Sequence, residues 1–319
     1  MVKAIKIDFM NKENTNYARG FSILMILVCH IAAVVLPTSI ARLMTPLGGI
    51  GVAVFLVISG YGNNESYLKH GTEFFWKKKL LNVVVPYIVA FAVYQALIGL
   101  FRDFNGLVRA FFTIESTYYW YIGYQLLWYF AFYLAVHKKS MAYKYTVLGV
   151  MAVLSFVLFN EIRAEQSFSF IIGVLLSDYK EIKKHVQNPF FAISALVLGV
   201  TCLALKQLPF VRNTGGLLMN LVQLFIKLPV AFFILIFVGW LMSRSFMRIF
   251  KRTLTILGDY SYEIYLAHSA CISLILMFSP TWLGVLMFAL TTVIMSLLLH
   301  VISSVIKKRP GRNDNIRTM

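Results

Sequence analysis

The chain has 319 residues, of which 59% are hydrophobic and only 13% are charged, and its mean hydropathy is +0.75. These values exclude a soluble globular domain and indicate an integral membrane protein. The net charge of +17 does not indicate a nucleic-acid partner, because the basic residues form short clusters between apolar runs and no continuous stripe.

Apolar runs, separated by charged, proline and glycine clusters, predict about ten transmembrane helices. They are expected near residues 20–37, 47–62, 80–101, 119–136, 145–159, 166–178, 189–205, 217–243, 254–278 and 282–305. The sequence therefore predicts an all-α, polytopic membrane protein with a single domain over residues 1–319. Short tails are expected at about 1–16 and 306–319.

The distribution of basic residues predicts the orientation of these helices. Most of the 30 lysines and arginines fall in the N-terminal segment, in every second connection and in the C-terminal tail. Because positively charged loops stay on the cytoplasmic side of a membrane, both termini are expected to be cytoplasmic. Only an even number of spans fits this pattern.

The first span contains two ionisable residues, Arg19 at its start and His30 near its middle. Their separation of eleven residues is almost three helical turns, so both lie on one face, roughly 16 Å apart along the axis. Ionisable groups inside a membrane helix indicate a functional site by default. The alternatives are a membrane anchor for Arg19 and a hydrogen-bonded packing residue for His30.

Small residues interrupt the second span in GGIGVAVFLVISGYG, which includes Ser59 and Gly60. They either allow close helix packing or mark a helix end whose backbone groups bind a ligand. Lys77, Lys78 and Lys79 follow at the entrance to the third span. These lysines are either a positive-inside anchor or a site for the phosphates of a nucleotide-like donor.

The ninth span begins with LGDYSYEIYLAH, which contains two acidic residues and a histidine. Asp259 is expected to cap the helix or to meet Arg252. Glu263 and His268 lie deeper and need partners, for which Arg19 and His30 across the bundle are candidates.

An aromatic cluster around Trp120 lies at the expected outer boundary of the fourth span. It is typical of an aromatic belt, with a minority of rings available to stack against sugars. Cys29, Cys202 and Cys271 lie inside expected spans without metal-ligand spacing, so the sequence predicts neither a disulfide framework nor a metal site.

These motifs, taken in order, resemble the integral-membrane acyltransferase 3 family, which acylates carbohydrates at bacterial surfaces. The resemblance covers about residues 17 to 305 and rests on RGFSILMILVCH, GVAVFLVISGYG, KKKLLNVVVPY, WYIGYQLLWYF and LGDYSYEIYLAH. Its most specific element is an Arg followed after ten residues by a His, matched here by Arg19 and His30. We expect no appended extracytoplasmic hydrolase-like domain of the kind that some members carry.

The resemblance implies transfer of an acyl group, usually acetyl, from cytoplasmic acyl-CoA to a sugar hydroxyl of a lipid-linked or cell-surface polysaccharide. The expected location is the bacterial cytoplasmic membrane, and acetyl-CoA or another acyl-CoA is a co-substrate rather than a permanently bound cofactor. His30 is expected to act as general base or acyl carrier, because neutral imidazole does either. Arg19 is expected to bind CoA phosphate or the developing charge on the thioester oxygen.

The candidate residues are expected either to bind the donor or to support the chemistry and the acceptor. The donor is expected to be held by Arg19, Lys78, Lys79, Ser59 and Gly60, and the chemistry or the acceptor to be supported by Glu263, His268 and Trp120. The family commonly has arginines at the entrance to helix three, where this chain has Lys78 and Lys79. Lysine attracts phosphate but lacks the bidentate fork of arginine.

Two non-enzymatic functions are also compatible with the sequence. A transporter or flippase for a lipid-linked sugar would use the same buried charges without forming a covalent bond. A membrane sensor would keep the fold without turnover, since fold does not imply function. The expected partners are acyl-CoA, a glycan or lipid-linked sugar and membrane lipid, with no nucleic acid, while the sequence leaves the oligomeric state open.

Overall fold

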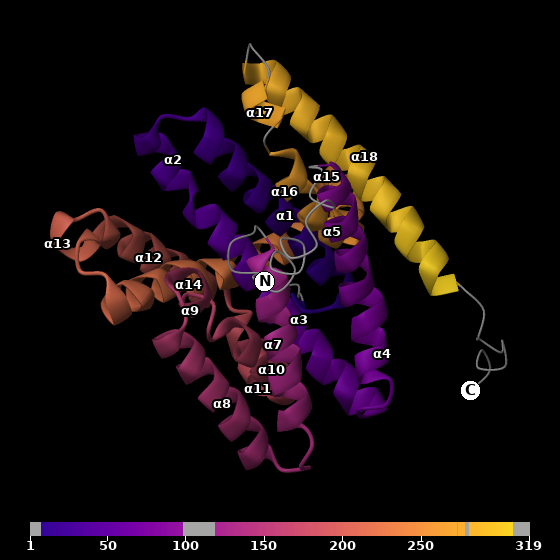
Figure 1. The fold of residues 1–319 in the computed structure, drawn as a ribbon. Helices are drawn as coiled ribbons and strands as arrows, with labels where there is room; N and C mark the ends of the chain where they lie inside the picture. Colours follow the sequence, from indigo (N-terminus) through magenta and orange to yellow (C-terminus); the bar gives the residue numbers. More distant parts are fainter. Residues whose placement is uncertain (1–7, 98–118, 273, 278–280, 309–319) are drawn as a thin grey trace.

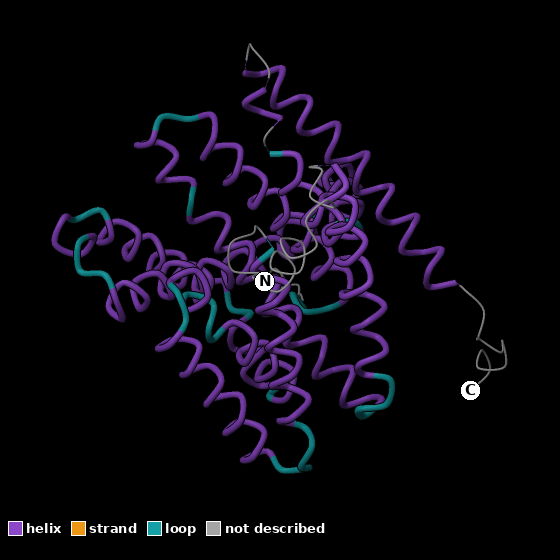
Figure 2. The backbone as a smooth tube through the Cα atoms, in the orientation of Figure 1, coloured by secondary structure: helices purple, strands orange, loops and turns teal. Residues whose placement is uncertain are grey.

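The computed structural model describes residues 8–97, 119–272, 274–277 and 281–308, and every regular element in these residues is a helix (Figure 1, Figure 2). In chain order the elements are α1 (Lys12–Val35), α2 (Thr38–Met44), α3 (Pro46–His70), α4 (Phe75–Lys79), the π-helix η1 (Leu80–Val84), α5 (Val85–Leu97), α7 (Trp120–Ala135), α8 (Met141–Leu158), α9 (Glu161–Ala164), α10 (Ser169–Asp178), α11 (Lys180–Val186), α12 (Pro189–Lys206), α13 (Pro209–Arg212), α14 (Gly216–Met242), the 3-10 helix η4 (Ser245–Met247), α15 (Arg248–Asp259), α16 (Ser261–Cys271), α17 (Leu274–Met277) and α18 (Thr281–Lys308). The prediction of an all-α protein is confirmed.

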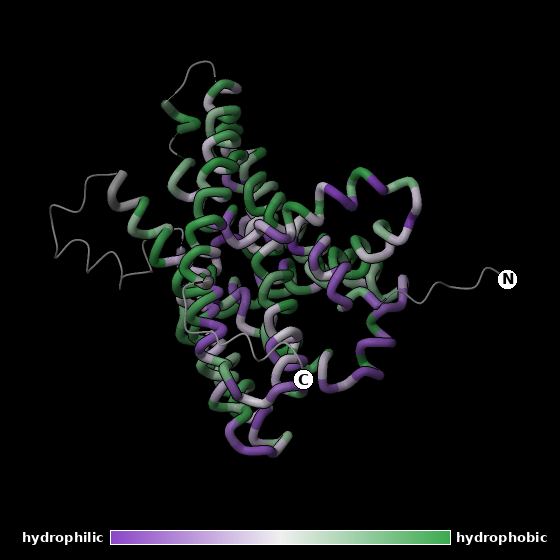
Figure 3. Tube along the Cα trace, turned by 90° about the vertical axis from the view of Figure 1, so that its right-hand side faces the viewer, coloured by the Kyte–Doolittle hydropathy of each residue, from purple (hydrophilic) through white to green (hydrophobic). Residues whose placement is uncertain are grey.

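Six helical segments in the described part of the chain are long and apolar enough to cross a membrane. They are Lys12–Val35, Thr38–His70, Met141–Leu158, Pro189–Lys206, Gly216–Met242 and Thr281–Ile306. Most of the helical trace is coloured hydrophobic, and hydrophilic stretches lie at ends and connections and also at points inside the bundle (Figure 3). A multi-pass membrane protein is therefore confirmed, while the total of ten spans and the side on which the termini lie stay predictions.

The other expected spans are shorter or divided in the structure. α7 has 16 residues and α10 has 10, whereas a bilayer core needs about 20 residues of helix. The expected span over 254–278 is split between α15, α16 and α17. The expected span over 80–101 begins with the π-helix and extends beyond the described residues.

Two long helices, α1 and α3, lie at the centre of the bundle. α1 packs against α3, α14 and α15, and α3 packs against α10 and α14 as well (Figure 1). α1 begins after Asn11, whose side chain accepts a hydrogen bond from the Asn14 amide at 2.7 Å and so caps the helix. α18 runs along one edge of the molecule and packs against α16 and α17.

Glycines allow α3 to approach α10 closely. A Cβ placed on Gly60 would lie 2.1 Å from the Phe170 carbonyl oxygen, and one on Gly173 would lie 2.1 Å from the Val57 carbonyl oxygen. α3 also continues without a break from Pro46 to His70. Close helix packing therefore accounts for Gly60. The helix does not end at this residue, so the alternative of an opened helix end does not apply to Gly60.

Substitution of Gly60 by alanine is expected to lower the stability of the bundle by about 1–3 kcal/mol, because the added methyl group overlaps a backbone carbonyl. The matched control is Gly149→Ala in α8, where nothing lies within 4 Å of the new methyl group. Thermal unfolding in detergent measures the difference. Equal melting temperatures for the two variants would show that α3 and α10 are not in backbone contact.

Two buried ion pairs connect helices that are distant in sequence. Lys227 of α14 lies 2.9 Å from Glu165, which follows α9, and Lys144 of α8 lies 2.6 Å from Asp178 of α10. The four side chains are each at most 9% exposed. Removing either member would leave an uncompensated charge in the interior, so both pairs fix the arrangement of these helices.

Candidate active site

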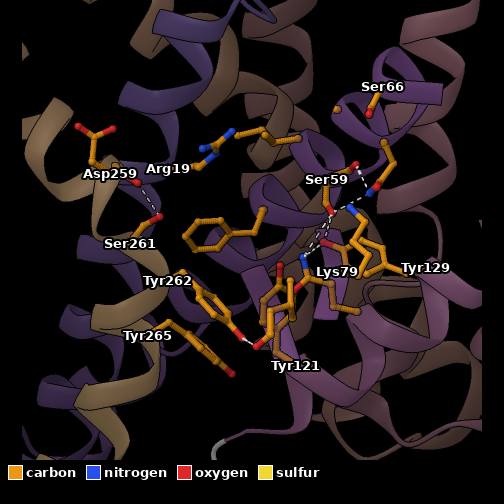
Figure 4. A pocket seen from close by; sticks show the side chains of 17 residues that line it. Arg19, Ser59, Ser66, Lys79, Tyr121, Tyr129, Asp259, Ser261, Tyr262 and Tyr265 are labelled. Atoms are coloured by element: carbon orange, nitrogen blue, oxygen red, sulfur yellow. Dashed lines mark hydrogen bonds between the residues drawn. The ribbon is translucent and has the colours of Figure 1, made fainter. Parts of the chain in front are cut away.

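A cavity of about 340 Å³ lies where α1, α3, α4, α7 and α16 meet. Arg19 comes from α1, Ser59 from α3, Lys79 from α4, and Tyr121 and Tyr265 from α7 and α16 (Figure 4). Its lining residues come from three separate parts of the chain, within residues 19–83, 121–129 and 258–265. The cavity is therefore a product of the tertiary fold.

Arg19 projects into this cavity between the α16 side and the α3 side (Figure 4). Its position on α1 is fixed by close contact with α15, because a Cβ on Gly258 would lie 2.2 Å from the Asn16 carbonyl oxygen. Asn16 also donates a 2.8 Å hydrogen bond to Asp259, which is the contact that Asp259 makes instead of the expected one with Arg252. Among the residues that the structure describes, Arg19 takes part in no ion pair.

Opposite Arg19, three polar side chains form a connected group. The hydroxyl oxygens of Ser59 and Tyr129 lie 2.9 Å apart, and Gln125 donates a 2.6 Å hydrogen bond to the Tyr129 hydroxyl. The Lys79 ammonium lies 4.1 Å from the centre of the Tyr129 ring. Burial, together with the neighbouring Lys78 charge, lowers the pKa of Lys79 to about 8.

Three other predicted donor and acceptor residues lie away from this group. Gly60 faces α10, as described above, and Lys78 is exposed on α4 and does not line the cavity. Trp120 stands at the start of α7, where its ring packs 6.2 Å from that of Tyr121 and 6.3 Å from that of Tyr124. The structure thus brings Arg19, Ser59 and Lys79 together and keeps the others apart.

His30 lies beside His268, with 5.1 Å between the ring centres. The Nδ1 atom of His268 is 2.6 Å from the Tyr265 carbonyl oxygen, and a carbonyl oxygen only accepts, so Nδ1 carries the proton. The Nε2 atom of His268 then has a free lone pair, and it is buried without a hydrogen-bond partner among the described residues. The structure therefore places a hydrogen-bond acceptor next to His30.

Glu263 does not pair with Arg19 or His30. Its Oε1 atom lies 3.0 Å from Nδ1 of His300 on α18. Glu263 therefore connects α16 to α18, while His268, one turn and a half further along α16, faces α1. In the part of the chain that the structure describes, no group of three His, Cys, Asp or Glu side chains is arranged to hold a metal ion.

Tyrosine side chains connect the cavity with the histidine pair. Tyr265 lines the cavity, and its ring centre is 5.4 Å from that of His268 and 5.3 Å from that of Tyr121. Tyr262, another lining residue, donates a 2.7 Å hydrogen bond to the Val83 carbonyl oxygen. Tyr265 thus contacts both the cavity that contains Arg19 and the histidine pair.

Tyr262 and Tyr265 were not among the candidate residues, and Tyr121 was expected only as one ring of the aromatic cluster around Trp120. Tyr121, Gln125 and Tyr129 follow one another at intervals of four, so they share one face of α7. Ser59, Asn63 and Ser66 form a similar polar stripe on α3. The sequence signal for these cavity residues is the helical spacing of polar residues within apolar spans.

The family model described as an acyltransferase domain, that of acyltransferase 3, matches residues 13–305. No curated protein and no solved structure matches significantly. The matched region contains Arg19, His30 and all of the residues named for the cavity. The chain therefore belongs to the acyltransferase 3 family.

Proposed function

We propose that this membrane acyltransferase moves an acetyl group from acyl-CoA to a sugar hydroxyl of a cell-surface or lipid-linked polysaccharide in the bacterial cytoplasmic membrane. The observation that carries the proposal is the cavity in which Arg19 and Lys79 face Ser59 and several tyrosine hydroxyls. Neither cation forms an ion pair with a described residue. Both charges are therefore available to an anionic ligand.

The chemistry of an acyl-CoA thioester matches these groups. Its phosphates are attracted by lysine and arginine, and negative charge develops on the thioester oxygen when the carbonyl carbon is attacked. Arg19 stays protonated in nearly any protein environment, so it suits either task. Ser59 and Tyr129, across the cavity from Arg19, supply hydroxyl groups that orient a bound carbonyl group.

The charge distribution supports a cytoplasmic opening for this cavity. Lys77 and Lys78 are exposed on α4, directly before the lining residue Lys79. By the positive-inside rule, this end of the bundle belongs on the cytoplasmic side, where acyl-CoA is found. The same rule supports cytoplasmic positions for both termini.

His30 is the proposed catalytic residue. As a general base, it takes the proton of the sugar hydroxyl while the hydroxyl oxygen attacks the thioester carbonyl carbon. The carbon–sulfur bond then breaks, and the proton passes from His30 to the departing thiolate. As an acyl carrier, the unprotonated ring nitrogen of His30 attacks the thioester carbon, the carbon–sulfur bond breaks, and the CoA thiolate takes the ring proton. The sugar hydroxyl oxygen then attacks the acyl carbon, the carbon–nitrogen bond breaks, and the hydroxyl proton returns to the ring. His268 supports either route, because its Nε2 lone pair can accept a hydrogen bond from the His30 ring.

Nanodiscs allow the enzyme to be distinguished from a transporter. Because a nanodisc has no second compartment, radiolabel that passes from acetyl-CoA to a lipid-linked glycan extract reports chemistry and not movement. We expect the wild-type protein to label the glycan. Absence of label with several acyl donors and glycans would contradict the proposal, and movement of a lipid-linked sugar across vesicles would then favour the transporter.

The pKa of Lys79 predicts how donor binding depends on pH. Because that pKa is lowered to about 8, Lys79 is charged below this pH and becomes neutral above it. The KM for acetyl-CoA is therefore expected to rise as the pH increases through about 8. In Lys79→Arg the side chain stays charged, so the rise should disappear. An unchanged pH profile in Lys79→Arg would exclude Lys79 as the titrating group.

A further inference from the structure

We propose that a second cavity, next to the first, binds the nucleotide part of the acyl-CoA donor. This cavity has a volume of about 450 Å³ and is formed by the end of α3, the turn that follows it, and the end of α7 with its connection to α8. Its lining includes Tyr67, Gly71, Thr72, Tyr133, His137 and Lys139. The inference rests on the proposed function and assigns the donor a second contact surface.

The two cavities are neighbours in the fold. Ser66 lines the first and Tyr67, the next residue of α3, lines the second. The Phe75 ring contacts a lining residue of each cavity, because its centre is 5.2 Å from the Lys79 ammonium and 5.6 Å from the Tyr133 ring. The two cavities therefore adjoin the same side chain and the same stretch of α3.

The size of the donor requires more space than the first cavity provides. Pockets for drug-sized ligands have volumes of about 300–1,000 Å³, and the first cavity, at about 340 Å³, is at the lower end of this range. An acyl-CoA has a long pantetheine arm and a phosphorylated adenosine diphosphate, so it is larger than such a ligand. The first cavity is large enough for only part of the donor, which leaves the nucleotide for an adjoining surface.

The chemistry of the second cavity suits a nucleotide with several phosphates. Lys139 and His137 are exposed at its edge, and they supply positive charge or hydrogen bonds for phosphate. Tyr67 and Tyr133 line the cavity with aromatic rings against which an adenine ring can pack. A Cβ on Gly71 would meet nothing within 4 Å, so the backbone at this turn is open to a ligand.

The backbone of the turn has a further unusual feature. Phe74 has a φ of 56°, which is rare for a residue with a bulky side chain, and α4 begins immediately after it. Such strained residues cluster at ligand-binding sites. Here the turn leads directly into Phe75 and Lys79, which adjoin the first cavity. The strained turn thus connects the two proposed parts of the donor site.

A charge reversal combined with a truncated donor tests this inference. In Lys139→Glu, the KM for acetyl-CoA is expected to rise about ten-fold or more at unchanged kcat, as loss of one contact to a charged group predicts. The KM for S-acetyl-pantetheine, which lacks the nucleotide, is expected to stay the same. Lys180→Glu, at an exposed lysine at the start of α11, is the matched control and should change neither value.

The outcomes separate this inference from its alternatives. An equal rise in KM for both donors, or no rise for either, would overturn it. Nanodiscs made of phosphatidylcholine alone test whether Lys139 binds an anionic lipid headgroup, because the effect on acetyl-CoA should persist there. Loss of the effect in neutral lipid would also overturn the inference. Absence of transfer by the wild-type protein from either donor would instead contradict the proposed function itself.

Discussion

Replacement of His30 by alanine is expected to reduce acyl transfer by about 10²–10⁴-fold or to abolish it, because general acid–base catalysis contributes that much to a rate. Binding of acetyl-CoA should be nearly unchanged, since His30 does not line the cavity that contains Arg19. The glycan-labelling assay in nanodiscs measures transfer, and equilibrium binding of radiolabelled acetyl-CoA measures the donor site.

Two further variants make the His30 result interpretable. His30→Gln keeps a hydrogen-bonding side chain of similar size, so it should also be inactive if the imidazole itself is required. His185→Ala removes a histidine on α11 whose Nδ1 contacts only the Glu181 carbonyl oxygen among the described residues, and it should retain full activity. Normal turnover by well-folded His30→Ala protein would exclude His30 as base and as acyl carrier.

Replacement of Arg19 by alanine is expected to lower kcat/KM for acetyl-CoA by about 10²-fold or more, because the charge available to the donor in the cavity is lost. Donor binding should weaken together with transfer. Arg19→Lys should recover part of the activity, since lysine keeps the charge and loses the fork geometry.

Arg42 provides the matched control for Arg19. It is an exposed arginine of α2, at the opposite end of α1 from the cavity, so Arg42→Ala should leave donor affinity unchanged. Thermal unfolding of both variants shows whether either loss comes from the fold. Wild-type donor affinity in Arg19→Ala would contradict the assignment of the cavity to the acyl-CoA.

The sequence predicted helices well where an apolar run is long. The runs near 217–243 and 282–305 correspond to α14 and α18, because a long, predominantly apolar segment has no other stable form in a bilayer. It predicted less well where a run is short. The segment near 166–178 contains the ten-residue α10. Hydrophobicity alone does not show whether such a short helix crosses a membrane or packs inside a bundle.

The candidate site was predictable only in part. Arg19 and His30 could be found because each is an ionisable residue in an apolar helix. The pairing of Glu263 with His300 could not, because it depends on how α16 packs against α18. The position of Tyr129 in the cavity could not be predicted for the same reason. Many aromatic residues lie near a membrane boundary, and only the packing shows which of them face a cavity.

Parallel measurement of donor binding and acyl transfer in wild-type, Arg19→Ala and His30→Ala protein tests the account most directly. Acetyl-CoA binding should be lost in Arg19→Ala and kept in His30→Ala, while transfer to the glycan should be lost in both. This separation would show that Arg19 holds the donor and that His30 performs the chemistry. Donor binding equal to wild type in Arg19→Ala, or transfer equal to wild type in His30→Ala, would contradict it.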